Sequence, residues 1–324
     1  MNKAGMVFAV FAGVVVLTLL LYGFFLLSTN EIGDSSQEFG TIELIKVPWM
    51  DIAATSAAAS LVLEALGYDV VVTSVSVPMV YQGLSSGEKD VFLGNWMPSM
   101  QEIAQPHLDH GTVENIGINL EGAKYTLAVP DYVAEQGVTH FSDLKGHAEL
   151  FDRTIYGIEP GNDGNELILQ MIEDDAYGLS DFILLESSEA GMLAEVNRHV
   201  ERQEWIVFLG WEPHPMNMKY NITYLAGGGE YFGSDYGAAN VYTNVRSGFM
   251  EERPNAARFF KNLEFTLEME NEIMMAMENG AEPREAAREW LKENPAILED
   301  WLAGVRTADG SDPVQTVYRH LGIE

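Results

Sequence analysis

The fold class of this chain is decided by the stretch Thr41–Val77, TIELIKVPWMDIAATSAAASLVLEALGYDVVVTSVSV. Its two ends, TIELIKV at 41–47 and VVVTSVSV at 70–77, are short, largely apolar runs that predict strands. The middle, 53–66, is rich in Ala and Leu and is followed by Gly67, a common helix stop, which predicts a helix. A strand, a helix and a second strand in this order indicate a βαβ unit.

Strands and helices continue to alternate beyond this unit, which predicts an α/β fold with open, mostly parallel sheets. This order of strands and helices fits two α/β lobes if the chain passes from the first lobe to the second near 125–130 and returns near Tyr220. We therefore expect 41–127 with 222–324 to form the first lobe and 128–221 the second. The other predicted strands cover 91–93, 123–129, 154–158, 182–185, 205–209, 222–226 and 241–245, and the other predicted helices cover 79–84, 166–176, 190–202, 254–267, 270–278 and 284–302.

The N-terminus carries a long apolar run. Met6–Leu27 reads MVFAVFAGVVVLTLLLYGFFLL, and Lys3 is the only charged residue among the first 30. About 20 apolar residues suffice to cross a bilayer, whereas the apolar region of a cleaved signal peptide has about 7–15. We expect residues 1–30 to be an uncleaved membrane anchor, with a signal peptide as the alternative, and the polar residues 31–40 to be a tether. The remainder then lies outside the cytoplasmic membrane, in the periplasm or its equivalent.

Composition excludes several classes of function. The 324 residues include 18 Lys and Arg against 49 Asp and Glu, a formal net charge of −31, which disfavours nucleic acid and favours a cationic or neutral ligand. The chain has no Cys, which excludes disulfides, thiolate metal sites, a Cys nucleophile and a lipid-modified Cys. With 47% hydrophobic residues, the chain has enough apolar sequence for a large core.

Three tryptophans share one context. Trp49, Trp96 and Trp211 each follow a predicted strand and have a Pro within two residues. Ligands of open α/β sheets bind at the carboxyl ends of strands, and Trp faces attract cations such as quaternary ammonium groups. A single Trp of this kind is most simply a buried anchor, but three together favour an aromatic site. Trp290 and Trp301 lie on the apolar stripe of a predicted C-terminal helix, where core packing is expected.

Five further segments belong together: VPWMD at 47–51, LGNWMP at 93–98, GAKYTL at 122–127, GIEPGNDG at 157–164 and GWEPH at 210–214. In combination they closely resemble the substrate-binding proteins of ABC importers for quaternary amines, and the choline-binding branch most of all. The resemblance extends from about Ile42 to the C-terminus, and its motifs are specific only in combination.

This resemblance implies a two-lobed periplasmic-binding-protein fold with a ligand cleft between the lobes. It also implies no catalysis and no cofactor or metal, with an ABC permease and its ATPase as separate partner chains. By this resemblance, an aromatic box around the trimethylammonium group would be formed by Trp49, Trp96, Tyr125 and Trp211. Asp51 would accept a hydrogen bond from the substrate hydroxyl, and Asn162 would lie near the same polar end.

The residues around the box favour choline over glycine betaine. Asp51 supplies a negative charge and a hydrogen-bond acceptor, and it would repel a carboxylate. No Arg stands beside any box segment to clamp a carboxylate. Choline is therefore the expected ligand, with glycine betaine or another methylated amine as the alternative. Asp51 is equally well placed to cap the helix that follows it, and Asn162 fits a simple turn before a helix.

Other motifs are weaker. Gly83–Gly87, GLSSG, matches the nucleophile elbow of serine hydrolases, but a predicted helix precedes Ser85 and a strand follows, the reverse of an elbow. A secreted hydrolase is therefore the disfavoured alternative from another class. The pairs His107 with His110 and Glu212 with His214 lack further metal ligands nearby in sequence. The chain has no phosphate-binding GxxxxGK[ST] motif, so the ATPase must be another chain.

Overall fold

The computed structural model describes residues 38–323. By its contacts the chain divides into two units, Met1–Gly40 and Thr41–Glu324, and the fold below is that of the second. The predicted anchor at 1–30 and most of the predicted tether at 31–40 lie outside the described residues. Among the helices between residues 38 and 323, none is long and apolar enough to span a membrane.

The strands within this described part form one nine-stranded mixed sheet in the order β2-β1-β3-β9-β4-β7-β5-β6, with β8 paired to β4. At one end β1 pairs in parallel with β2 and β3, and at the other end β5 pairs in parallel with β6 and β7. The strands are β1 (Thr41–Lys46), β2 (Asp69–Ser74), β3 (Val91–Met97), β4 (Val113–Pro130), β5 (Thr154–Tyr156), β6 (Ile183–Leu185), β7 (Val207–Glu212), β8 (Ile222–Tyr224) and β9 (Ala238–Arg246).

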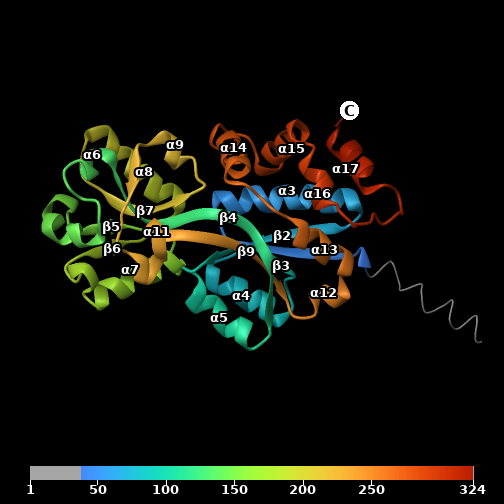
Figure 1. Cartoon of the computed structure of the whole chain (residues 1–324), viewed down its shortest axis with the longest axis horizontal. Helices are drawn as coiled ribbons and strands as arrows, with labels where there is room; N and C mark the ends of the chain where they lie inside the picture. Colours follow the sequence, from blue (N-terminus) through green and yellow to red (C-terminus); the bar gives the residue numbers. More distant parts are fainter. Residues whose placement is uncertain (1–37, 324) are drawn as a thin grey trace, which may run out of the picture. The chain divides into compact units, whose positions relative to one another are not determined.

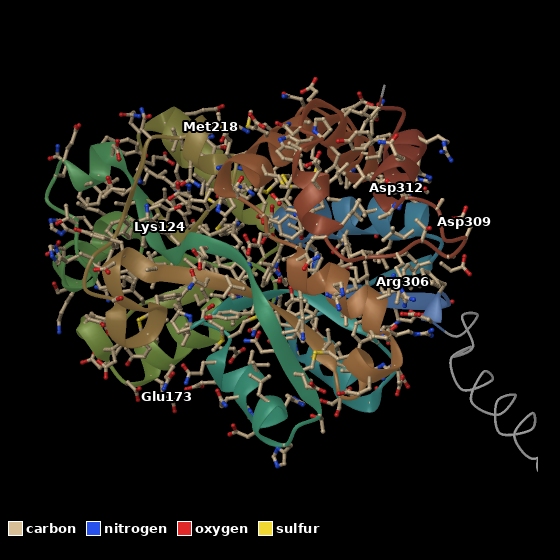
Figure 2. All side chains as sticks on the ribbon, turned by 45° about the vertical axis from the view of Figure 1, so that its right-hand side comes forward. Lys124, Glu173, Met218, Arg306, Asp309 and Asp312 are labelled. Atoms are coloured by element: carbon tan, nitrogen blue, oxygen red, sulfur yellow. The ribbon has the colours of Figure 1, made fainter. Side chains whose placement is uncertain are left out.

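The middle of the sheet corrects the prediction of mostly parallel strands. The 18-residue strand β4 pairs antiparallel with β9 along 113–124 and with β7 along 124–128. It thus runs from the β1–β3 end of the sheet to the β5–β7 end. Helices and further strands lie in the chain between β4 and either partner, so neither pair is the two strands of a single βαβ unit, and both pairs are antiparallel. Lys124 of β4, which is labelled in Figure 2, forms an ion pair of 2.9 Å with Glu212 of β7 at this crossing.

Helices cover both faces of the sheet at each end, which produces two α/β lobes (Figure 1). In the first lobe α3 packs against α14, α15 and α17 on one side of β1–β3, and α4 and α5 lie on the other side. In the second lobe α6, α8 and α9 lie on one side of β5–β7 and α7 on the other. The two lobes confirm the α/β class. The helices named here are α3 (Met50–Leu66), α4 (Val77–Ser86), α5 (Gln101–Asp109), α6 (Asp131–Ala134), α7 (Asp163–Glu173), α8 (Glu189–Arg202), α9 (Met216–Lys219), α14 (Leu267–Glu278), α15 (Pro283–Glu293) and α17 (Pro313–Leu321).

Shorter elements complete the described part: the 3-10 helices η1 (Phe141–Phe151) and η2 (Ala176–Gly178), and the α-helices α10 (Gly229–Phe232), α11 (Ser234–Gly237), α12 (Phe249–Glu252), α13 (Pro254–Asn262) and α16 (Ile297–Trp301). Sequence patterning predicted neither η1 nor α5 nor α17. The predicted helix over 284–302 is interrupted around Pro295, between α15 and α16.

Helix α3 places the first part of the site. It ends as predicted at Gly67, whose φ of 104° is the left-handed conformation that glycine adopts most easily. It begins at Met50, three residues before the predicted start, and Trp49 occupies its N-cap position. The early start brings Trp49 and Asp51 to the N-terminal end of a buried helix, directly after β1.

The other tryptophans partly correct the prediction. Trp96 and Trp211 lie within β3 and β7, near the strand ends rather than beyond them. Trp301 is 1% exposed, which confirms core packing. Core packing is wrong for Trp290, which is only half-buried and donates its indole N–H to Glu272 of α14 at 2.6 Å. The indole N–H of Trp290 has a hydrogen-bond acceptor near the surface, and the pattern of apolar residues along the helix does not predict such a partner.

Candidate functional site: an aromatic cavity between the lobes

Four aromatic side chains from both lobes surround one cavity. Trp49 and Trp96 come from the first lobe, Trp211 comes from the second, and Tyr125 comes from β4, which connects them. Tyr125 and Trp211 are direct partners in the β4–β7 ladder. The cavity has about 260 Å³ of empty volume and is lined by Trp49, Asp51, Trp96, Tyr125, Ile158, Asp163 and Trp211.

The rings meet edge to face. The ring centroids of Trp96 and Tyr125 are 6.1 Å apart at 61°, and those of Tyr125 and Trp211 are 6.3 Å apart at 77°. Tyr125 also packs edge-on against Phe232, with centroids 5.8 Å apart. Trp49, Trp96, Tyr125 and Trp211 are all buried. Edge-to-face packing fixes the ring planes, so the walls of the cavity are rigid and aromatic.

Asp51 lies in the first turn of α3 and faces this cavity. Its Oδ2 atom accepts a hydrogen bond of 3.2 Å from the indole N–H of Trp96. Its Oδ1 atom is buried, and no group within residues 38–323 donates to it. Burial, together with the nearby Glu189 carboxyl group, raises the pKa of Asp51 to about 7. The alternative that Asp51 caps the helix is wrong, since Trp49 holds the N-cap position and no side-chain cap bond forms.

Asn162 holds the tyrosine of the cavity. Its Oδ1 atom accepts from the Tyr125 hydroxyl at 2.8 Å and from the Asn165 backbone N–H at 3.1 Å, which makes it the N-cap of α7. Its Nδ2 atom donates to Asp163 Oδ1 at 3.1 Å. The turn expected before a helix at this point is therefore present, and Asn162 supports Tyr125 from outside the group of side chains that line the cavity.

Asp163 is a cavity residue that sequence reasoning missed. It is 1% exposed, and in the described part of the chain its Oδ2 atom makes no hydrogen bond, although the Ser99 side chain and the backbone of Gly164 stabilise the charged form of this carboxyl group. Burial raises the pKa of Asp163 to about 6. The cavity therefore holds two buried carboxyl oxygens without partners, Asp51 Oδ1 and Asp163 Oδ2. The only sequence signal for Asp163 was its position beside Asn162 in the PGNDG turn. Sequence alone did not indicate whether the side chain of Asn162 or that of Asp163 faces the cavity.

More carboxyl groups surround the cavity. Glu159 accepts the indole N–H of Trp49 at 2.6 Å, and burial raises the pKa of Glu159. Glu270 of α14 is 2% exposed, and burial, with a further contribution from Asp51, raises its pKa well above the usual range. A basic group also lies near Asp51: burial lowers the pKa of Lys46, and the carboxyl groups of Asp51 and Glu189 oppose this shift. The local charge therefore favours a cation and opposes an anion.

The competing motifs are not assembled into sites. Ser85 lies inside α4, so the strand-to-helix turn of a nucleophile elbow is absent, although its Oγ atom contacts His107 Nδ1 at 2.6 Å. Glu212 pairs with Lys124, whereas His214 pairs with Glu189. Between residues 38 and 323 no group of three or more His, Asp or Glu residues is arranged to hold a metal ion.

Residues 40–293 match the family described as the substrate-binding domain of ABC-type glycine betaine transport systems, OpuAC. The chain belongs to this family. Its members are extracytoplasmic binding proteins of transport systems rather than a class of enzyme. This result agrees with the resemblance seen in the five sequence segments.

Solved structures support the same assignment. The structure of an ABC-transporter choline-binding protein in complex with choline is 49% identical, has a TM-score of 0.86, and covers 89% of this chain and 100% of that one. Lactococcal OpuAC complexed with glycine betaine is 28% identical, has a TM-score of 0.74, and covers 81% of this chain and 99% of that one. The two-lobed binding-protein fold is thereby established for this substrate-binding protein.

Curated relatives cover less of the chain. The glycine betaine/carnitine transport binding protein GbuC of Listeria monocytogenes is 34% identical over 176 residues, which are 54% of this chain and 57% of that protein. An uncharacterised protein of Chromohalobacter salexigens, ORF1, is 54% identical over 132 residues, which are 41% of this chain and 85% of that protein.

Proposed function

We propose that this protein captures choline in the aromatic cavity and delivers it to an ABC permease driven by a separate ATPase. The observation that carries this proposal is the convergence of four aromatic rings and two unpartnered carboxyl oxygens on one buried cavity. Trp49, Trp96, Tyr125 and Trp211 would enclose the trimethylammonium group, and Asp51 would accept the hydroxyl hydrogen bond. Asn162 would act at the same polar end, where it holds Tyr125.

The magnitudes are adequate for binding. A desolvated cation–π contact contributes about 1–2 kcal/mol, so four rings contribute roughly 4–8 kcal/mol. A micromolar dissociation constant requires about 8 kcal/mol. Hydrogen bonds to Asp51 and burial by lobe closure would supply the remainder.

The carboxyl groups favour choline over glycine betaine. A betaine carboxylate would have to approach Asp51 and Asp163 in a buried space, where like charges repel strongly. No Arg is among the residues that line the cavity in the described structure. A choline hydroxyl can instead donate to Asp51 Oδ1, which lacks a donor. Glycine betaine remains the second candidate, because the description of the matching family names it and lactococcal OpuAC was solved in complex with it.

We also propose the arrangement of the whole chain. Residues 41–127 and 222–324 would form the first lobe and 128–221 the second, with β4 crossing from one to the other. Residues 6–27 would anchor the protein in the cytoplasmic membrane, with Lys3 on the cytoplasmic side and the lobes in the periplasm or its equivalent.

The proposal is tested by titrating the purified protein with choline, glycine betaine and trimethylamine N-oxide while following Trp fluorescence. We expect a saturable response, tightest for choline, because three Trp rings line the cavity. No response to any of the three amines would refute the proposal. A tighter response to glycine betaine than to choline would replace the proposed ligand with the second candidate. Ester turnover that is lost in Ser85→Ala would instead support the hydrolase.

A further inference from the structure

A buried carboxyl group behind the cavity connects the two lobes. Glu189 is the first residue of α8 in the second lobe and is 8% exposed. Its Oε2 atom accepts the backbone N–H of Met50, the first residue of α3 in the first lobe, at 3.2 Å. Its Oε1 atom is 3.0 Å from His214 Nε2. Glu189 therefore binds one group from each lobe.

The hydrogen-bond direction at His214 follows from its other neighbour. The backbone N–H of Met216 lies 3.1 Å from His214 Nδ1 and can only donate, so Nδ1 must carry a lone pair. The ring proton is then on Nε2 and is donated to Glu189. His214 is 1% exposed, so water cannot readily replace these bonds. Glu189 thus receives two directed N–H bonds through its two oxygens.

The two residues that are hydrogen-bonded to Glu189 each adjoin residues that line the cavity. Met50 stands between Trp49 and Asp51, and the ring of His214 packs against Trp211 with centroids 4.8 Å apart. Neither Glu189 nor His214 lines the cavity itself. Any effect of Glu189 on a ligand must therefore pass through the residues that it positions.

We propose that Glu189 and His214 form a latch that positions the N-terminus of α3 against Trp211 and so holds the lobes closed around the ligand. This proposal rests on the proposed function, because it concerns residence of the ligand in the same cavity. The latch exists only when the lobes are together, since its two donors come from different lobes. Its loss should therefore speed ligand release and leave ligand capture by the open protein unchanged.

The sharpest variant is Glu189→Gln. An amide has one acceptor oxygen and one NH2 group, so it can accept from Met50 or from His214, but not from both. The His ring cannot compensate by moving its proton to Nδ1, because Met216 donates there. One N–H donor, on Met50 or on His214, then lacks its acceptor in the closed state. We expect choline dissociation at least about ten-fold faster in stopped-flow measurements, with an association rate within about two-fold of the unmodified protein.

The matched control is an exposed ion pair that also joins the lobes. Lys219 of α9 and Glu278 of α14 are 3.1 Å apart, with 49% and 34% of their side chains exposed. Exposed pairs contribute little to stability, so Lys219→Met should change the dissociation rate by less than about two-fold. An equal acceleration in Lys219→Met and Glu189→Gln would mean that any contact between the lobes has this effect, and would overturn the latch.

A second measurement does not require the ligand to be choline. Because the chain contains no Cys, Glu88→Cys in the first lobe and Glu173→Cys in the second can be labelled specifically; Glu173 is marked in Figure 2. Distances between the labels should shift toward longer values when Glu189→Gln is added to the ligand-free protein. Unchanged distances together with an unchanged dissociation rate would refute the latch. Failure of both proteins to bind any quaternary amine, with the distance shift present, would refute the proposed function alone.

Discussion

Choline affinity should fall steeply below neutral pH because of Asp51. Burial and Glu189 raise the pKa of Asp51 to about 7 in the ligand-free protein. A bound cation favours the ionised carboxylate, so ligand binding at low pH must first release the proton. The affinity is therefore full above this pKa and is lost as the pH falls through it.

The size of the effect follows from that pKa. With a pKa of about 7 and one released proton, affinity is roughly halved at pH 7, reduced about ten-fold at pH 6 and about a hundred-fold at pH 5, relative to pH 8. Burial raises the pKa of Asp163 to about 6, so its protonation would cause a second loss of choline affinity at lower pH. Lys46, Glu159, Glu189 and Glu270 also surround Asp51 or Asp163 and modify the slope.

Calorimetric titration with choline at pH 5, 6, 7 and 8 measures this dependence. In buffers of different ionisation enthalpy, the same titrations give the number of protons released. Asp51→Asn should bind more weakly at pH 8 and lose most of the dependence between pH 8 and pH 6, and its preference for choline over glycine betaine should shrink. Asp163→Asn serves as the control and should keep the step near pH 7. A pH-independent affinity in the unmodified protein, or an unchanged slope in Asp51→Asn, would refute the reasoning.

Four further outcomes are expected. Trp96→Ala and Trp211→Ala should each weaken choline binding about five- to thirty-fold while both proteins remain folded, as measured by fluorescence titration and circular dichroism. Trp301→Ala should leave affinity unchanged but lower stability to chemical denaturation by about 3–5 kcal/mol, because this ring is 1% exposed. Ser85→Ala should bind choline normally, and a large loss would place Ser85 in the site. Glu270→Gln should raise the melting temperature at pH 8 and not at pH 5, because burial raises the pKa of Glu270 and ionisation opposes folding at high pH; equal shifts at both pH values would count against this.

Much of the fold was predictable because its signals are local. Strand and helix periodicity, with Gly67 as a helix stop, gave the βαβ order and the two lobes. The antiparallel β4–β9 pair was not predictable, because periodicity identifies strands without identifying their neighbours. The early start of α3 was missed for a similar reason, since Trp49 is not a usual N-cap residue.

The site was only partly predictable from sequence. The three tryptophans were found because Trp49, Trp96 and Trp211 share a context near strand ends, whereas Tyr125 was identified only through the family resemblance. The buried carboxyl groups Glu159 and Glu189 were missed, because each contacts a residue more than a hundred positions away, Trp49 or Met50. Such contacts are fixed by how the lobes meet, and no local pattern in the chain marks them.

The central claim is that the cavity between Trp49, Trp96, Tyr125 and Trp211 holds a quaternary ammonium ligand. A crystal structure of the protein grown with choline tests it most directly. The account predicts the trimethylammonium group among the four rings and the hydroxyl oxygen within hydrogen-bonding distance of Asp51. Choline bound elsewhere, or no choline in the cavity at a saturating concentration, would contradict it.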